Sequence, residues 1–250
     1  MRNFTRYIIL ICLLLCSMQG KAITKVDADN EYKKGNYQQA IKDYNELLRQ
    51  GISADLYYNL GNAYYRSDNI TQAVLAYERA HLLSPGDDDI KFNLEFARSK
   101  TIDKFPVESE MFFVTWYRAL VNFTSVDHWG YIAIFSIAFA LFLMLVYLFG
   151  SNIWMRKIGF YGSVVFVLVF ALSNLFAYQQ REALMNRSGA IVISSSVPVY
   201  KTPTRAESEQ FVIHEGTKVE ITDKTMKGWR GVKLSDGRTG WIQENSIEEI

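Results

Sequence analysis

Cysteine is almost absent from this chain of 250 residues, which has only Cys12 and Cys16, both near the N-terminus. If that segment is removed, the remaining protein has neither a disulfide nor a thiol for catalysis or metal binding. An excess of charge of one sign is lacking too, because 27 basic residues face 26 acidic ones. Nucleic-acid binding needs a concentrated basic face, so the composition argues against nucleic acid as a partner.

Motifs of the common enzyme classes are also lacking. The sequence has no Gly-x-Ser-x-Gly, no His-Glu-x-x-His and no phosphate-binding loop. Its three histidines, His81, His128 and His214, lie in different regions, and none has a second ligand at a metal-binding spacing. We therefore expect no enzymatic activity, no cofactor and no metal.

The N-terminal segment has the layout of a secretory signal. Two arginines precede an apolar run that is too short to span a bilayer. Ala22 is a small residue that suits cleavage, so residues 1–22 are predicted to be a signal peptide, whose removal leaves 24 basic and 26 acidic residues. A lipoprotein signal ending at Cys16 is the alternative, but Leu15 stands where such a signal has a small residue.

Two uncharged apolar segments of bilayer length lie in the middle of the chain, residues 129–149 and 158–178, with 21 residues each. At about 1.5 Å per residue, each helix covers roughly 30 Å, the thickness of the hydrocarbon layer. The connecting segment 150–157 carries Arg156, Lys157 and no acid, which predicts a cytoplasmic loop. We expect a transmembrane hairpin with the rest of the chain outside the cytosol.

A repeat of 33 to 34 residues precedes these spans. The segment 35–44 recurs as 68–77, and 58–63 recurs as 92–97. A period of this length is typical of tetratricopeptide repeats, which have two helices per unit. The complete unit runs from Ala54 to Asp87 and resembles that family at its bulky, small and proline positions, which are Tyr57, Leu60, Gly61, Tyr64, Ala73, Tyr77, Ala80 and Pro85.

This resemblance implies an all-α stack over residues 23–100 that binds peptides on its concave face. Asp27 stands where the pattern has Leu, which predicts an irregular or frayed first helix, and a lone helix from Asp88 to Ser99 would cap the stack. In the family's register, the groove residues are Lys25, Asp29, Asn59, Asn62, Tyr65, Arg66 and Asn93. The alternative is that they are merely a solvated helix face. Asp29 and Asp89 also replace the Asn and Lys of the carboxylate clamp found in chaperone-binding members.

Aromatic residues dominate residues 101–128, between the stack and the first span. Phe112, Phe113, Trp116 and Tyr117 follow a spacing of three and four residues, which predicts one apolar helix face. Because this face leads directly into an apolar span, we interpret it as an interfacial helix at the lipid headgroups. The alternative is that these aromatics belong to the core of the stack.

Beyond residue 186 the pattern changes to short alternating strands with turn signals about every ten residues, which predicts a small all-β barrel. The segments 215–219, 228–232 and 236–242 resemble the bacterial SH3 family over residues 186–250. That resemblance implies an aromatic groove for peptidoglycan stems or peptides, with Tyr200, Trp229 and Trp241 as candidates. Trp241 is also a candidate for the barrel core, and Lys201 begins a run unlike the Arg-Ser-Gly-Pro-like run of ligand-binding members.

The order of these parts resembles the BatE family, the repeat proteins of the Bacteroides aerotolerance (Bat) set. The resemblance implies a multidomain protein of the bacterial inner membrane with both soluble domains in the periplasm. Its partners would be other membrane proteins of the Bat set, which bear von Willebrand-type domains and work under a MoxR-type ATPase. The implied role is a non-enzymatic scaffold in envelope maintenance under oxidative or other stress. A tether to peptidoglycan through the SH3-like domain is the alternative.

Overall fold

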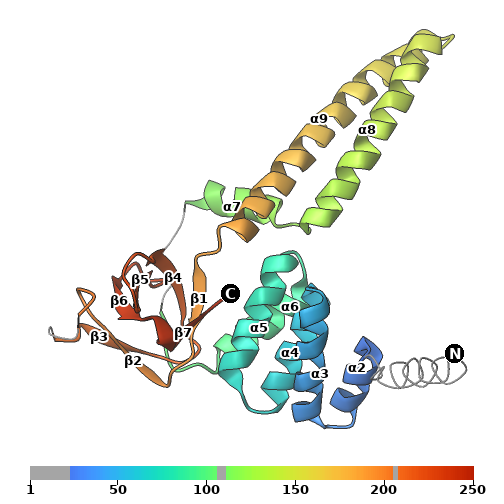
Figure 1. Ribbon diagram of the computed structural model, residues 1–250. Coiled ribbons are helices and arrows are strands. Elements are labelled where there is room, and N and C mark those ends of the chain that lie inside the picture. Colours follow the sequence, from blue (N-terminus) through green and yellow to red (C-terminus); the bar gives the residue numbers. More distant parts are fainter. Residues whose placement is uncertain (1–22, 106–110, 205–207) are drawn as a thin grey trace, which may run out of the picture.

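The structure is a computed structural model that describes residues 23–105, 111–204 and 208–250 (Figure 1). The expected signal peptide, residues 1–22, lies outside the described residues. Three parts follow one another along the chain: a stack of helices, an apolar helical hairpin and a β-rich C-terminal region.

The N-terminal stack is built from short helices that follow one another in antiparallel pairs (Figure 1). They are α2 (Lys25–Lys33), α3 (Tyr37–Gln50), α4 (Ala54–Arg66), α5 (Ile70–Leu83) and α6 (Asp88–Arg98). Polar side chains cap the start of α2, α4, α5 and α6. For example, Ser53 accepts a hydrogen bond from the amide of Leu56, and Asp87 accepts one from the amide of Ile90.

The first helix is regular, contrary to the expectation from Asp27. The Thr24 hydroxyl accepts a hydrogen bond from the Asp27 amide, and the Asp27 carboxylate accepts one from the Thr24 amide. This reciprocal capping box satisfies two amides at the start of α2. The acid therefore begins the helix instead of interrupting it, and Ala28 in the next turn is fully buried in a cluster with Tyr44.

Small residues bring the paired helices into close contact, as the repeat pattern predicts. Ala73 and Ala80 on α5 are fully buried. A Cβ atom on Gly61 would lie 2.6 Å from the ring of Tyr77, which is itself buried. Only a residue without a side chain therefore allows α4 and α5 to pack at this distance.

The hairpin consists of α8 (Val126–Phe149) and α9 (Ile153–Met185), and both helices are long and apolar enough to cross a membrane. They pack closely at Gly159, where a Cβ atom would lie 2.6 Å from the backbone nitrogen of Tyr147. α9 begins inside the segment expected to be a loop, so that the connection is residues 150–152. It also extends past residue 178, the expected end of the second span.

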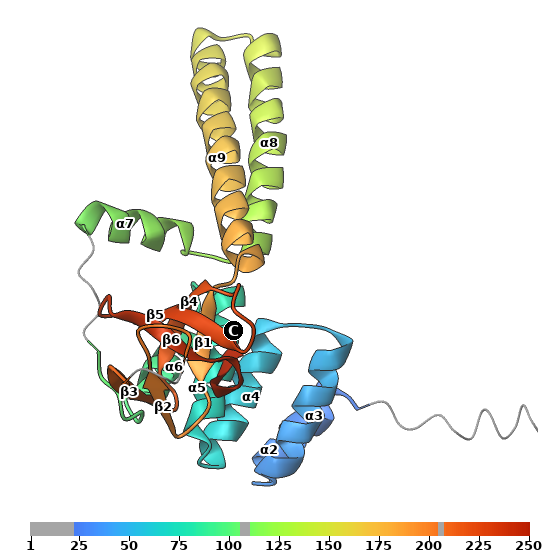
Figure 2. The ribbon, with the colours of Figure 1, turned by 60° about the vertical axis from the view of Figure 1, so that its left-hand side comes forward.

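Helix α7 (Phe112–Val121) lies beside the base of the hairpin, with its axis crosswise to α8 and α9 (Figure 2). The Nε1 atom of Trp129 donates a hydrogen bond to the Val121 carbonyl at 2.9 Å, and Nε2 of Gln180 donates to the same oxygen at 2.7 Å. The exposed side chains at this helix include Phe112, Phe113, Trp116 and Phe123. None of these four belongs to a buried cluster of the stack, so the structure does not place them in the repeat core.

Short antiparallel strands make up the C-terminal region. They are β1 (Gly189–Val192), β2 (Ser196–Val199), β3 (Phe211–His214), β4 (Lys218–Asp223), β5 (Trp229–Lys233), β6 (Thr239–Gln243) and β7 (Ile247–Glu249). Five of them form a sheet in the order β6-β5-β4-β1-β7, and β2 and β3 form a second sheet.

The closed barrel predicted from the sequence does not form among these strands. A single backbone bridge between Tyr200 and Trp241 joins the two sheets in the part of the chain that the structure describes. Pro198 in β2 has no amide hydrogen to donate to a further strand, and the strands are only three to six residues long. The core between the sheets is aliphatic and includes Val197 and Ile213.

The β-rich region packs against the stack beside α5 (Figures 1 and 2). Ile191 of β1 and Ile250 are 0% and 7% exposed, and they share a buried cluster with Val74 on α5 and with Leu94 and Ala97 on α6. Among the described residues no further helix of the stack follows α6, and the strand residue Ile191 and the C-terminal Ile250 pack there instead. The stack and the β-rich region thus form one packed unit.

Candidate functional sites

Three of the expected groove residues meet where α2 lies beside α4. Nζ of Lys25 is 2.7 Å from a carboxylate oxygen of Asp55 and 3.7 Å from one of Asp29. Asp29 in turn accepts hydrogen bonds from the Tyr44 hydroxyl at 2.6 Å and from Nδ2 of Asn59 at 3.5 Å. Burial, followed by the bond to Asp29, raises the pKa of Tyr44, so this hydroxyl remains a neutral donor. These polar groups bind one another and hold the first helices together.

A second network lies between α4, α5 and α6. Oδ1 of Asn62 accepts hydrogen bonds from the Tyr77 hydroxyl at 2.7 Å and from Nδ2 of Asn93 at 3.1 Å. Nδ2 of Asn93 also donates to the Tyr58 hydroxyl at 2.9 Å. Asn62 and Asn93, both predicted to face a ligand, therefore have protein partners, and their first role is to fix the spacing of neighbouring units.

The two remaining groove residues lie beside aromatic rings. Nε of Arg66 donates to the Tyr37 hydroxyl at 3.2 Å, and its guanidinium carbon is 5.6 Å from the centre of that ring. Tyr65 packs against Phe96 with ring centres 5.6 Å apart, and Phe92 stacks on Phe96 at 6.3 Å with nearly parallel rings.

Phe92 and Phe96 were not among the residues predicted from the sequence. They are 68% and 46% exposed, whereas Ile90 and Leu94 of the same helix are buried. The signal was present in the sequence, because two phenylalanines four residues apart stand out of phase with the buried positions of α6. They lie beside Tyr65, one of the expected groove residues.

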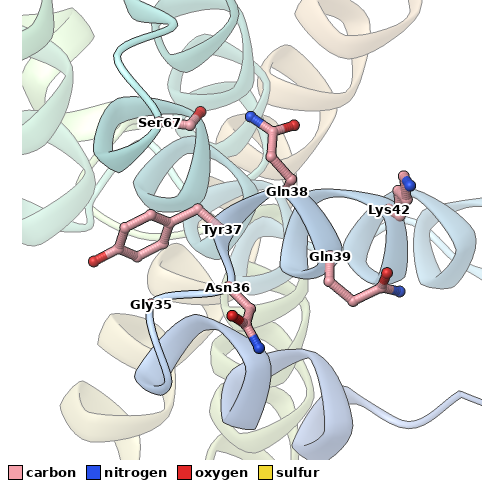
Figure 3. A pocket seen from close by; sticks show the side chains of 7 residues that line it. All are labelled: Gly35, Asn36, Tyr37, Gln38, Gln39, Lys42 and Ser67. Carbon is pink, nitrogen blue, oxygen red and sulfur yellow. The ribbon is translucent and has the colours of Figure 1, made fainter.

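Two open hollows lie on the stack. One has a volume of about 570 Å³ and lies where α3 begins and α4 ends (Figure 3). It is lined by Gly35, Asn36, Tyr37, Gln38, Gln39, Lys42 and Ser67. The other, of about 590 Å³, lies between α3, α4 and α5 and includes Tyr57 and Arg79 in its lining. The lining of the first hollow has no acid and no histidine, so it provides hydrogen-bonding groups and one cation but no pair for acid–base chemistry.

The three aromatic residues predicted for the SH3-like groove do meet. Tyr200 and Trp229 are in T-shaped contact with ring centres 5.6 Å apart. The Tyr200 and Trp241 backbones exchange hydrogen bonds of 2.9 and 2.7 Å. All three residues are half-buried, and Trp241 is not in the aliphatic core cluster. β5 and β6 are at the opposite edge of the sheet from β1 and β7, so this aromatic cluster lies away from the contact with the stack.

A buried carboxylate joins the stack to the β-rich region. Glu78 on α5 has a side chain that is 2% exposed, and it pairs with Arg98 on α6 and with Nζ of Lys218 on β4 at 2.8 Å. Burial alone would raise the pKa of Glu78, but the charges of Lys218 and Arg98 outweigh it and hold the pKa below its usual range. The carboxylate is therefore ionised and bridges three elements.

A second carboxylate, Asp103, joins the segment after α6 to the same region. It accepts hydrogen bonds from the His214 amide at 2.6 Å and from the Thr217 hydroxyl at 2.7 Å, and it lies 2.9 Å from Nδ1 of His214. Burial would raise the pKa of Asp103, but these bonds outweigh it and lower the pKa. This contact positions the β-rich region against the segment that follows α6.

No group of three or more His, Cys, Asp or Glu side chains in the described residues could hold a metal ion. His81 on α5 is partly buried, and burial lowers its pKa. His128 contacts the hydroxyl of Ser125, and His214 contacts Asp103. The three histidines lie in separate places, and the pairing of His214 with a carboxylate 111 residues earlier in the chain was not predicted from the sequence.

Comparison with known proteins agrees with the repeat geometry. A family model described as tetratricopeptide repeat matches residues 54–87, which is the complete unit predicted from the spacing. No curated protein matches the chain. The protein therefore contains a tetratricopeptide repeat, a helical unit typical of non-enzymatic scaffolds for protein–protein interaction.

Proposed function

We propose that this protein is a membrane-anchored scaffold that holds partner proteins through its tetratricopeptide repeats. The observation that carries this proposal is the repeat itself, with α2, α4 and α6 as the first helices of successive units. Stacked repeats of this kind provide extended concave binding surfaces. The internal hydrogen bonds of Asn62 and Asn93 support a preformed surface, which binds with a smaller loss of entropy.

The hairpin α8–α9 is the proposed anchor, inserted in the bacterial inner membrane with its short connection in the cytosol. Both helices expose leucine, isoleucine and phenylalanine, which suits contact with lipid chains. Helix α7 lies beside the base of this hairpin, where its exposed aromatics suit the headgroup layer (Figure 2). The stack and the β-rich region would then share the periplasmic side.

Alkaline-phosphatase fusions test this topology. A fusion after Ser99 is expected to be active and a fusion after Ser151 inactive, because the enzyme folds only outside the cytosol. Activity at Ser151 would reverse the proposed orientation.

We place the scaffold within a Bat-type complex under a MoxR-type ATPase, on the resemblance of the whole order of parts to the BatE family. Capture of partners from native membranes by the full chain is the test. Gly61→Trp should abolish capture, because even a Cβ atom at this position meets the Tyr77 ring. Gly51→Trp is the matched control, since a Cβ atom at Gly51 meets no atom within 4 Å. If the wild type captures nothing above background, the scaffold proposal fails.

A peptidoglycan tether is the second candidate, supported by the cluster of Tyr200, Trp229 and Trp241 on the side of the sheet away from the stack. The full chain in detergent should then sediment with purified sacculi. Tyr200→Ala should weaken this binding far more than Lys227→Ala, a change at an exposed residue. Absence of sacculus binding at any salt concentration would leave the β-rich region as a protein-binding or spacing element.

A further inference from the structure

An aromatic patch is formed by the half-buried Tyr65 on α4 and the exposed Phe92 and Phe96 on α6. Phe92 is 68% and Phe96 46% exposed, although both rings are in contact with an aromatic neighbour. Between them in the sequence, Asn93 is hydrogen-bonded to α4, which fixes the orientation of α6. Clustered aromatic side chains on a rigid surface are typical of the residues that dominate binding energy in protein interfaces.

Lys100 borders this patch, and Arg66 is the next residue after Tyr65 on α4. The ammonium group of Lys100 lies 5.3 Å from the centre of the Phe96 ring. The contacts of Arg66 are the hydroxyl and ring of Tyr37. Neither cation forms a salt bridge within the described parts of the chain. Both therefore keep their charge available to a ligand.

A cation recurs at the same position of each repeat unit, near the end of its first helix. Lys33, Arg66 and Lys100 are separated by 33 and 34 residues and stand at or just beyond the ends of α2, α4 and α6. Cations at these ends also complement the helix dipoles, and Lys33 likewise has no salt bridge in the described residues. Two acids on α6 have no salt bridge within the described residues. Asp89 lies at the other end of the helix, roughly 16 Å from Lys100, whereas Glu95 is exposed between Phe92 and Phe96.

The patch lies at the end of the stack that points away from the hairpin. Where α6 begins, a side chain at Gly86 would collide with the backbone of Phe123, next to the base of the hairpin. α6 runs from there away from α7 (Figure 1), so Lys100 lies at its far end. A ligand on this patch would approach from the aqueous compartment and not from the lipid.

We propose that the aromatic patch binds a peptide segment of a partner protein in which a large apolar side chain is flanked by Asp or Glu. The apolar side chain packs on Phe92 and Phe96, and the acids pair with Arg66 and Lys100. This inference rests on the proposed scaffold function and states the chemistry of its partner. The same cations disfavour a basic segment, because like charges at a contact reduce affinity.

Selection from a phage-displayed random peptide library tests this inference, with the full-length chain in detergent micelles as the target. Enriched peptides should combine acidic residues with Phe, Leu, Ile or Trp. For an enriched peptide, Phe92→Ala should raise the dissociation constant about tenfold or more, as for a residue at the centre of an interface. Ile52→Ala is the control, because Ile52 is equally exposed at 62% but lies outside the patch.

The cations are tested by the double variant Arg66→Gln/Lys100→Gln, with Lys227→Gln as the control. The double variant should weaken binding severalfold at low salt, and the difference from wild type should shrink at high salt because surface charges are screened. Enriched peptides that are basic or lack apolar residues would overturn the inference, as would peptides that bind all variants equally, or the absence of any enriched peptide. If Phe92→Ala and the double variant still capture membrane partners as the wild type does, this inference fails while the scaffold function stands. If the wild type captures no partner, the scaffold function itself fails.

Discussion

Glu78 offers a sharp test of how the stack and the β-rich region are held together. Its carboxylate is 2% exposed, whereas the side chains of Arg98 and Lys218 are 41% and 45% exposed. Replacing Glu78 by Gln therefore leaves two cations that water can still solvate. The cost is the loss of two charge-assisted hydrogen bonds, offset by the desolvation that a neutral amide avoids, and we expect a decrease of about 2 kcal/mol in the free energy of unfolding.

Removing both cations instead should lower the free energy of unfolding further. The variant Arg98→Met/Lys218→Met leaves a buried carboxylate without a partner, which costs about 3–5 kcal/mol at neutral pH. Adding Glu78→Leu to this variant removes the stranded charge and should recover most of that loss, because an apolar replacement of a buried ionic group is often neutral. The triple variant is thus expected to be more stable than the double variant.

Urea unfolding of the full chain in detergent micelles, followed by circular dichroism, measures these differences. The pH dependence adds a second criterion. In the wild type the pKa of Glu78 is lowered on folding, so its contribution is present above the unfolded pKa and is lost as the pH falls through the folded pKa. In the double variant the folded pKa should be raised, so its stability should increase as the pH falls from 7. A triple variant less stable than the double one, or equal pH slopes in wild type and double variant, would refute the reasoning.

Two further predictions concern the packing of the stack and its junction with the strands. Gly61→Ala should lower the melting temperature measurably, with a cost of about 1–3 kcal/mol from the clash with Tyr77, while Gly51→Ala should change it little; equal melting curves would contradict the packing argument. In the wild type the lowered pKa of Asp103 stabilises the fold above the unfolded pKa of about 3.9, and this contribution is lost as the pH falls through the folded pKa. Asp103→Asn should weaken the contact with His214 and abolish this contribution, so that the variant loses less stability than the wild type when the pH is lowered. Acid titrations followed by circular dichroism should then differ between wild type and variant below about pH 4; superimposable titrations would exclude this role.

Features that depend on local chemistry were predictable from the sequence. The tetratricopeptide unit at 54–87 was confirmed, because small residues such as Gly61 and Ala73 must recur wherever paired helices touch. The prediction of a frayed first helix was wrong for an equally local reason. The repeat pattern has Leu at the position of Asp27, so an acid there suggested a disrupted helix. In the structure its carboxylate accepts a hydrogen bond from the amide of Thr24 and thereby caps α2.

Features that depend on which surfaces meet were not predictable in the same way. The residues of the candidate groove were inferred from the family register. In the structure, however, Asn62 and Asn93 form hydrogen bonds with each other and with Tyr77 and Tyr58. Phe92 and Phe96 were overlooked because a phenylalanine in a helix is ordinarily assigned to the core. Their exposure is known only once the packing of α6 is known.

By itself, the sequence determined the periodic and compositional features: the repeat, the two apolar helices and the β-rich C-terminal region. Each depends on residues close together in the chain, whose spacing dictates one helix face or one strand face. Only the tertiary structure decided that the strands form two sheets without closing, and that Ile191 and Ile250 pack on α5 and α6. It also brought Glu78 between Arg98 and Lys218, from elements up to 140 residues apart. Such contacts follow from the complementarity of two folded surfaces, which no local pattern of residues specifies.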